Sequence, residues 1–302
     1  MQENELKDLL KDFGNNVIFN QDLKKKNWFN IGGRSKEFYK ADNLKELIKF
    51  LKLLNNEEKI FVIGAGSNIL ISDSLFDGVV IKLSKNFNRT SLLGEDVIIS
   101  GSAVLDRNLS QFAEKNHLSG FEFLSCIPGS IGGGIRMNAG CFGKEFKDIL
   151  LSIQTIDKFG NVKTIPSKDI KFESRKNNLS DDWIFLSASF KGTKSNYLKI
   201  KNEMNKLKAE KEKSQPTKIK TSGSTFKNPI SQSKKKVWEL IKDSVPLDKS
   251  FGDAYISDRH CNFFVNKGQA TFEDMKNLID YVSKKVLKKT GINLEKEIKI
   301  LE

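Results

Sequence analysis

The stretch IPGSIGGGIRMNAG, residues 127–140, is rich in glycine and carries apolar side chains between the glycines. Such glycine density does not suit the interior of a helix or a strand. It suits main chain that approaches a ligand closely and offers free N–H groups to it. A solvated linker would not place Ile131, Ile135 and Met137 among its glycines. We therefore favour a loop packed against a ligand over a mobile linker.

A second glycine turn follows an apolar segment earlier in the chain. Residues 59–63, KIFVI, have the composition of a buried strand, and GAGSN follows at residues 64–68. A dinucleotide-binding fingerprint would need a third glycine at the position of Ile69. The two glycines, with Ser67 and Asn68, can still direct N–H groups and short polar side chains at a pyrophosphate. A simple tight turn is the alternative interpretation of this motif.

Three further segments are uninformative when each is taken alone. Residues 222–229, SGSTFKNP, fit a turn, and residues 254–266, AYISDRHCNFFVN, fit a strand with a polar loop. Within the second segment, His260 is more often a structural histidine than a ligand. Residues 294–298, LEKEI, fit a solvated edge strand.

The composition excludes several classes of protein. The 302 residues include 51 Lys+Arg and 38 Asp+Glu, a net charge of +13, but the lysines are scattered and form few clusters. We therefore expect no nucleic-acid binding, and a small anionic ligand is served equally well by this charge. Three cysteines without a C-x-x-C motif and two histidines predict no disulfide framework, no metal site and no Ser-His-Asp triad. Residues 1–16 predict no signal peptide, no apolar run is long enough to span a membrane, and we expect a cytoplasmic protein.

Hydrophobic periodicity predicts both helices and strands. Residues 272–290 form the clearest helix, because Thr271 and Asp274 form a capping signal and Gly291 can end it. A polar helix over residues 197–213 is the best candidate for a boundary between domains, and it should end before Pro216. Other expected helices are 43–55, 105–117 and 235–242, and other expected strands are 69–71, 79–83, 97–100, 149–156, 161–165, 183–190, 262–265 and 296–301.

Taken together and in this order, the motifs I-P-G-x-x-G-G…M-N-A-G and G-S-x-F-K-N-P resemble the UDP-N-acetylenolpyruvoylglucosamine reductase family. The resemblance extends from Asn27 to Ile300 and matches the shorter of two family types. It is carried by Asn27–Gly33, Gly64–Leu70, Asp73, Gly120–Phe123, Ile127–Gly143, Gln215-Pro216, Gly223–Pro229, Ser257–Asn266 and Leu294–Ile298.

The resemblance implies an α+β fold with two domains. Residues 1–195 would form a two-lobed FAD-binding domain of the vanillyl-alcohol-oxidase (PCMH) type, with lobes at about 1–78 and 79–195. Residues 196–302 would form a C-terminal α/β domain that binds the UDP-sugar. The implied activity is FAD-dependent reduction of UDP-N-acetylglucosamine enolpyruvate to UDP-N-acetylmuramate by NADPH, in peptidoglycan precursor synthesis. We expect a monomer that binds neither nucleic acid nor membrane.

The resemblance also implies site residues. Arg175, Ser224 and Glu297 match the family's catalytic residues, with Ser224 as the proton donor. Lys227, Asn228 and Arg136 are candidates for binding the substrate, and Lys218 is a weaker candidate for its diphosphate. The candidates for binding FAD are Gly64, Ala65, Gly66, Ser67, Asn68, Gly129, Ser130, Gly132, Gly133, Asn138, Ala139 and Gly140.

The chain departs from the family pattern near the candidate arginine. Ser174 and Asn177 stand where the family usually has Tyr and Ser, and Cys126 stands where a Gly is usual. Two alternatives therefore stay open beside the reductase: another flavin oxidoreductase of the same fold, such as an oxidase, and a non-catalytic relative that binds UDP-sugars.

Overall fold

A computed structural model of the chain describes residues 11–54, 57–216 and 219–302. Its contacts divide the chain into two compact units. Unit 1 comprises Met1–Asn20, Lys36–Ala65 and Asp77–Glu210, and unit 2 comprises Gln21–Ser35, Gly66–Phe76 and Lys211–Glu302. The chain therefore passes repeatedly from one unit to the other. The domains expected from the sequence stay a prediction: residues 1–195 would bind FAD, and residues 196–302 would bind the UDP-sugar.

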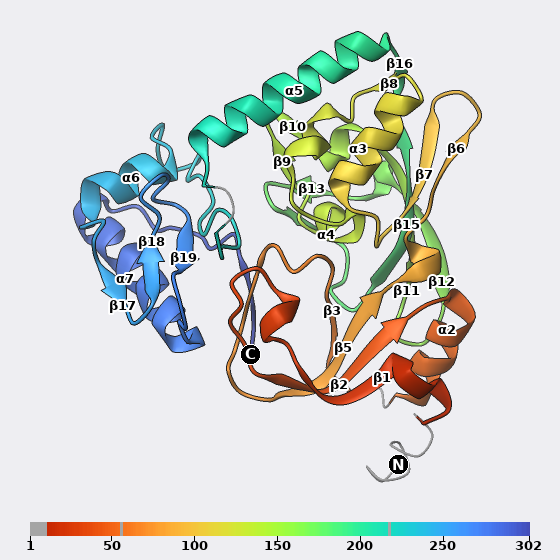
Figure 1. The fold of residues 1–302 in the computed structure, drawn as a ribbon, viewed down its shortest axis with the longest axis horizontal. Coiled ribbons are helices and arrows are strands. Elements are labelled where there is room, and N and C mark those ends of the chain that lie inside the picture. Colours follow the sequence, from red (N-terminus) through yellow and green to blue (C-terminus); the bar gives the residue numbers. More distant parts are fainter. Residues whose placement is uncertain (1–10, 55–56, 217–218) are drawn as a thin grey trace. The chain divides into compact units, whose positions relative to one another are not determined.

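A four-stranded sheet with the order β1-β2-β5-β3 lies in the N-terminal half of the chain (Figure 1). Its strands are β1 (Val17–Asp22), β2 (Arg34–Ala41), β3 (Ile60–Val62) and β5 (Phe76–Leu83). Helix α2 (Leu44–Leu53) begins at Asn43, whose side chain accepts a hydrogen bond from the Glu46 N–H at 2.9 Å. The helix buries Leu47 and Phe50 against this sheet, as its apolar spacing predicts.

An antiparallel five-stranded sheet with the order β12-β11-β15-β7-β6 forms the other half of unit 1. Its strands are β6 (Thr90–Leu93), β7 (Val97–Gly101), β11 (Leu150–Ile156), β12 (Val162–Pro166) and β15 (Ile184–Lys191). Helix α3 (Asp106–Lys115) covers it with Leu109 and Ala113. The predicted hairpin around Gly160 is confirmed, with Ile156 opposite Val162.

The expectation that glycine density excludes a helix in residues 119–143 is wrong. A short helix, α4 (Ile131–Arg136), runs through Gly132, Gly133 and Gly134. A Cβ atom at Gly134 would lie 2.2 Å from the Phe146 ring, so glycine is required there by tertiary packing. Contacts with neighbouring segments therefore override the poor helix propensity of glycine.

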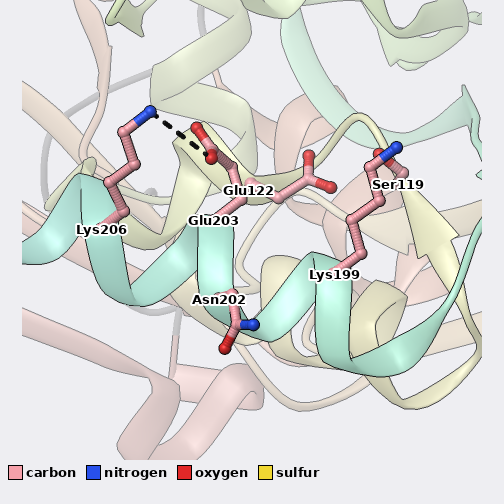
Figure 2. A pocket seen from close by; sticks show the side chains of 6 residues that line it. All are labelled: Ser119, Glu122, Lys199, Asn202, Glu203 and Lys206. Atoms are coloured by element: carbon pink, nitrogen blue, oxygen red, sulfur yellow. Dashed lines mark ion pairs between the residues drawn. The ribbon is translucent and has the colours of Figure 1, made fainter.

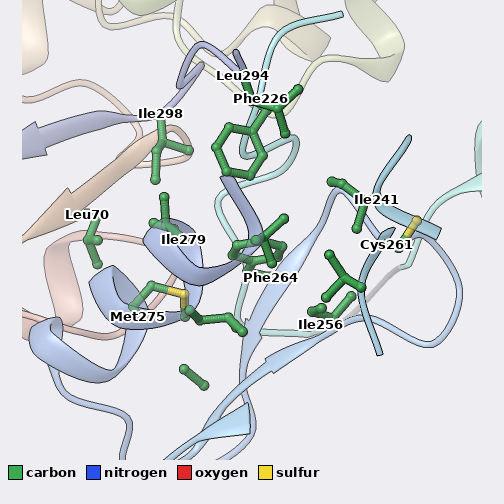
Figure 3. Close-up of a cluster of buried hydrophobic side chains, with 14 of the residues drawn as sticks. Leu70, Phe226, Ile241, Ile256, Cys261, Phe264, Met275, Ile279, Leu294 and Ile298 are labelled. Carbon is green, nitrogen blue, oxygen red and sulfur yellow. The ribbon is translucent and has the colours of Figure 1, made fainter. Parts of the chain in front are cut away.

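Unit 2 has its own hydrophobic core (Figure 3). It is built from a meander of β17 (Ser250–Phe251), β18 (Ala254–Ile256) and β19 (Phe264–Asn266), and from helices α6 (Val237–Ser244) and α7 (Phe272–Thr290). A parallel pair joins β4 (Ile69–Ile71) to β20 (Lys299–Leu301). Phe29, Ile31 and Leu70 are buried in this core, so residues from the N-terminal third of the chain complete unit 2.

The predicted ends of two helices, α7 and α5 (Tyr197–Ser214), are confirmed. The Thr271 hydroxyl accepts from the Asp274 N–H at 3.1 Å, and Gly291 takes a left-handed φ of 71° after α7. Helix α5 ends before Pro216 and contains the passage between the units, after Glu210. The remaining short strands are β8 (Leu118–Ser119), β9 (Gly140–Cys141), β10 (Lys144–Glu145), β13 (Phe172–Glu173), β14 (Lys176–Asn177) and β16 (Thr193–Lys194).

Candidate active site

The two predicted glycine segments meet inside unit 1. A Cβ atom at Gly64 would lie 2.4 Å from the Ser130 Oγ, so the Ser130 side chain approaches the main chain of Gly64 more closely than a side chain at position 64 would permit. Ser130 pairs with Leu105 in an isolated bridge and precedes α4. Residues that are 66 positions apart therefore form one surface, and both belong to the set predicted to bind FAD.

We expected the N–H groups of residues 127–140 to be free, and for most of these residues that expectation is wrong. The N–H of Gly129 donates to the Ile127 carbonyl, and that of Gly132 donates to the Ser102 carbonyl at 2.9 Å. The segment is thereby bonded to the loop that precedes α3. Gly133 differs in its surroundings: it is exposed, and a side chain there would meet within 4 Å only the Ser130 Oγ, at 3.6 Å. The glycines therefore contribute mainly by lacking a side chain, which lets other groups approach the main chain closely, more than by offering a row of N–H donors.

Buried polar groups surround this surface. The hydroxyls of Ser102 and Ser130 and both oxygens of Asp106 are buried, and none of them has a hydrogen-bond partner within the described residues. Desolvation by burial raises the pKa of the Asp106 carboxyl well above its ordinary value, which favours the neutral acid. Glycine main chain beside buried hydroxyls whose hydrogen bonds are not used by the protein suits close approach by a polar ligand such as FAD.

Arg175 and the predicted segment 138–140 also meet in unit 1. The hairpin of β13 and β14 turns at Ser174 and Arg175, and Arg175 has a left-handed φ of 59°. Its guanidinium donates to the Gly140 carbonyl at 3.3 Å. Asn138, which is fully buried, donates to the Glu173 carbonyl at 3.2 Å and so attaches this hairpin to the glycine segment. Asn138 has a positive φ of 38°, which asparagine tolerates better than most other residue types do.

Arg136 uses its guanidinium for contacts within unit 1. It donates to the carbonyls of Leu179, Ser180 and Trp183, the last at 2.6 Å. Its charge lies over the Phe185 ring at 4.1 Å. Desolvation by burial lowers its pKa, although Asp181 opposes this effect. These contacts give Arg136 a structural role, and substrate binding by Arg136 stays a prediction.

Ser224 and Glu297 come from segments that lie side by side in unit 2. Ser224 pairs with Phe263, and Phe226 pairs with Lys296, in isolated antiparallel bridges. The Glu297 N–H donates to the Thr225 carbonyl at 2.8 Å. Ser224 and Glu297 are both half-buried. The structure thus brings together the main chains of two residues that are 73 positions apart and that were predicted to be catalytic.

The predicted turn at residues 64–68 contributes to the same part of unit 2. The passage between units falls between Ala65 and Gly66. Beyond it, the Asn68 amide donates to the Glu297 carbonyl at 3.2 Å, and the Asn68 carbonyl accepts from the Lys299 N–H. Asn68 therefore holds the segment that carries Glu297. Ser67 is half-buried.

The predicted substrate-binding residues of unit 2 already have protein partners. The Lys227 ammonium pairs with the Glu295 carboxylate at 3.2 Å, and it is less exposed than its partner. The Asn228 side chain accepts from the Val237 N–H at 3.0 Å, at the start of α6. Lys218, the weaker candidate, lies outside the described residues.

Sequence reasoning missed two groups beside these sites. Asn262 is buried and bonds to the main chain of Phe226 in both directions. Asp106, at the start of α3, lies under Gly129. Asn262 lies in the segment Ser257–Asn266 that carries the resemblance, but no role was predicted for it. An aspartate at a helix start is too common to single out Asp106.

A pocket of about 660 Å³ lies elsewhere in unit 1, along α5 (Figure 2). It is lined by Ser119, Glu122, Lys199, Asn202, Glu203 and Lys206. The ion pair drawn there joins Lys206 and Glu203, one turn apart on α5, at 3.7 Å. No residue predicted for the site belongs to this pocket.

Comparison with known families matches both parts of the chain. Residues 36–165 match a family model described as an FAD binding domain. Residues 215–301 match the model of the C-terminal domain of UDP-N-acetylenolpyruvoylglucosamine reductase. The presence of an FAD-binding domain is thereby confirmed, and its predicted bounds, 1–195, stay a prediction. Among the described residues, no helix is both long and apolar enough to cross a membrane.

Individual relatives cover the whole chain. The UDP-N-acetylenolpyruvoylglucosamine reductase of Pelagibacter ubique is 62% identical over 302 residues, all of both chains. That of Rickettsia typhi is 43% identical over 277 residues, 92% of each chain. The crystal structure of the reductase from Thermus caldophilus has a TM-score of 0.82 and 29% identity, and the match covers 95% of this chain and 98% of that one. The chain therefore belongs to the UDP-N-acetylenolpyruvoylglucosamine reductase family, whose members are FAD-dependent oxidoreductases of peptidoglycan synthesis.

Proposed function

We propose that Ser224, Glu297 and Arg175 carry the chemistry by which this enzyme reduces UDP-N-acetylglucosamine enolpyruvate to UDP-N-acetylmuramate. The observation that best supports the proposal is the contact of Thr225 and Phe226, directly after Ser224, with Lys296 and Glu297 in unit 2. The candidate residues within 64–68 and 129–140 would hold FAD, which would supply the methylene carbon of the enolpyruvyl group with a hydride drawn from NADPH. The protein supplies position, charge and a proton.

Ser224 is the proposed proton donor. Addition of hydride to the methylene carbon leaves an electron pair on the adjacent carbon and its carboxylate. The Ser224 hydroxyl gives its proton to that carbon, which completes a two-electron reduction of the double bond. A free serine is a poor acid, so the alkoxide that it leaves needs a nearby positive charge and is later reprotonated by solvent.

Arg175 and Glu297 act on the charge that develops. The Arg175 guanidinium is always cationic, and it suits the substrate carboxylate as negative charge spreads onto it. Glu297 orients or protonates the enol oxygen. The hydrogen bond from Asn68 and the bond between Glu297 and Thr225 support a fixed main-chain position for this glutamate.

The UDP part of the substrate needs cationic and polar partners. We propose that Lys227 leaves its contact with the exposed Glu295 and binds the diphosphate, because a surface ion pair is worth little and is easily exchanged. Asn228 and Arg136 are the further candidates. In this proposal residues within 1–195 bind FAD, and residues within 196–302 bind the UDP-sugar together with Arg136 and Arg175.

Replacing Ser224 by alanine separates the two halves of the reaction. We expect Ser224→Ala to bind FAD and to lose its flavin absorbance on addition of NADPH, as the parent enzyme does. Recovery of that absorbance on anaerobic addition of the enolpyruvyl substrate should be slower by about 10² or more, because general acid catalysis contributes that much. Recovery at the parent rate would rule out Ser224 as the proton donor.

The remaining proposals concern the state of the protein in the cell. We propose that it acts as a cytoplasmic monomer with no nucleic-acid or membrane partner. The scattered lysines support this interpretation, since they form no continuous basic motif. Light scattering of the purified chain tests the monomer, and a dimer mass would contradict it.

A further inference from the structure

The side chain of Asn262 acts on Phe226 as a neighbouring strand would. The Phe226 N–H donates to the Asn262 Oδ1 at 3.0 Å, and the Asn262 Nδ2 donates to the Phe226 carbonyl at 2.9 Å. Both bonds are buried, and Asn262 is only 2% exposed. One amide therefore satisfies both main-chain polar groups of the residue two positions after Ser224.

The main chain of Asn262 bonds to the same segment. The Thr225 N–H donates to the Asn262 carbonyl at 2.8 Å, so three hydrogen bonds from one residue hold residues 225 and 226. On the other side, the Thr225 carbonyl accepts from the Glu297 N–H. The Phe226 ring is fully buried and packs edge-on against Phe264, with 6.0 Å between ring centroids (Figure 3).

The conformation of Asn262 is itself fixed. Its N–H donates to the His260 Nδ1 at 3.3 Å, which requires the neutral form of that nitrogen. Desolvation by burial lowers the pKa of His260 and favours that neutral form. Asn262 thus has a defined position, and both the oxygen and the nitrogen of its side-chain amide form hydrogen bonds with the segment after Ser224.

We propose that Asn262 is a positioning residue for proton transfer, which fixes the main chain next to Ser224 so that the hydroxyl faces the carbon it protonates. The inference rests on the proposed role of Ser224. Short side chains such as serine cannot correct a displaced main chain, and a displacement of about 1 Å can cost about 10² in rate. Loss of the Asn262 amide should therefore slow the proton-dependent half of the reaction and spare the reduction of FAD by NADPH.

Asn266 provides a matched control within the same unit. It is also 2% exposed, and its amide donates to the Phe29 carbonyl and accepts from the N–H groups of Gly268 and Ala270. It makes no side-chain bond to residues 224–227. Asn262→Ala and Asn266→Ala should therefore lose similar stability, so a difference between them in one half-reaction reports positioning and not a weakened fold.

The experiment follows flavin absorbance anaerobically in both holoenzyme variants, well below their melting temperatures. NADPH should bleach both at the parent rate. Addition of the enolpyruvyl substrate should restore the absorbance of Asn262→Ala about 10²-fold more slowly than that of Asn266→Ala. Equal recovery in the two variants overturns the proposal. If Ser224→Ala also recovers at the parent rate, it is the role of Ser224 that has failed.

Asn262→Asp gives a second, independent measurement. A protonated carboxyl can donate to the Phe226 carbonyl and accept from its N–H, whereas a carboxylate places a negative oxygen against that carbonyl. Recovery by substrate should therefore accelerate as the pH falls, relative to the parent enzyme at each pH. A pH profile parallel to that of the parent, or loss of the fold in both Asn262 variants, would also overturn the proposal.

Discussion

Asp106 is a buried carboxyl without a hydrogen-bond partner in the described part of the chain, and burial raises its pKa. The native state therefore holds this proton more tightly than the unfolded state, where the pKa is about 3.9. Its stabilising contribution is complete below that value and is lost as the pH rises through the native pKa. We expect Asp106→Asn to become more stable relative to the parent as the pH increases above 4, by at most about 1.4 kcal/mol per pH unit.

Urea unfolding of both proteins across this range measures the difference. Asp243 provides a control of opposite sign, because its hydrogen bond with Lys235 lowers its pKa. That carboxylate stabilises the fold above the unfolded pKa and loses its effect as the pH falls. Asp243→Asn should therefore lose stability relative to the parent as the pH rises. Parallel curves for Asp106→Asn and the parent would contradict the account of Asp106.

At the scale of elements, the hairpin of β13 and β14 is attached to α4 by Asn177, one of the three departures from the family pattern. Its amide donates to the Ile135 and Arg136 carbonyls at 3.0 and 3.1 Å, at the end of that helix. Asn177→Ala leaves buried carbonyls without these donors and should cost about 1–3 kcal/mol. The neighbouring Asn178 is exposed, and Asn178→Ala should cost at most about 1 kcal/mol. Chemical denaturation measures both, and equal costs would contradict a fixing role for Asn177.

At the scale of the whole molecule, unit 2 is not a continuous part of the chain. A fragment of residues 211–302 lacks β4 and the core residues Phe29, Ile31 and Leu70. We expect this fragment to show no cooperative thermal unfolding by circular dichroism, because a partner strand and part of the core are missing. A fusion that restores residues 21–35 and 66–76 through Gly/Ser spacers is the control and should regain a transition. Cooperative unfolding of the bare fragment would contradict this expectation.

What could be predicted from the sequence was local or was carried by motifs. Helix α7 and its two ends were predicted correctly, because Thr271, Asp274 and Gly291 act within one turn of the helix. The resemblance identified the family and the FAD-binding domain. Helix α4 was missed because its start is held by hydrogen bonds from Ile131 and Gly132 to the carbonyls of Val104 and Ser102, which only the fold brings near. The bonds between Asn262 and Phe226 could not be predicted, since only the fold makes residues 36 positions apart neighbours.

The parallel pairing of β4 with β20 affects how the protein folds while it is being synthesised. Strand β4 is buried in the folded protein, but its partner begins only at Lys299, more than 200 residues later in the chain. At the usual speed of ribosomes, about 5–20 residues per second, the Ile-Leu-Ile segment waits on the order of ten seconds or longer for that partner. During this interval the nascent chain presents an unpaired apolar strand, which invites aggregation or capture by a chaperone. The pairing of β4 therefore cannot form until the segment of β20 has been synthesised.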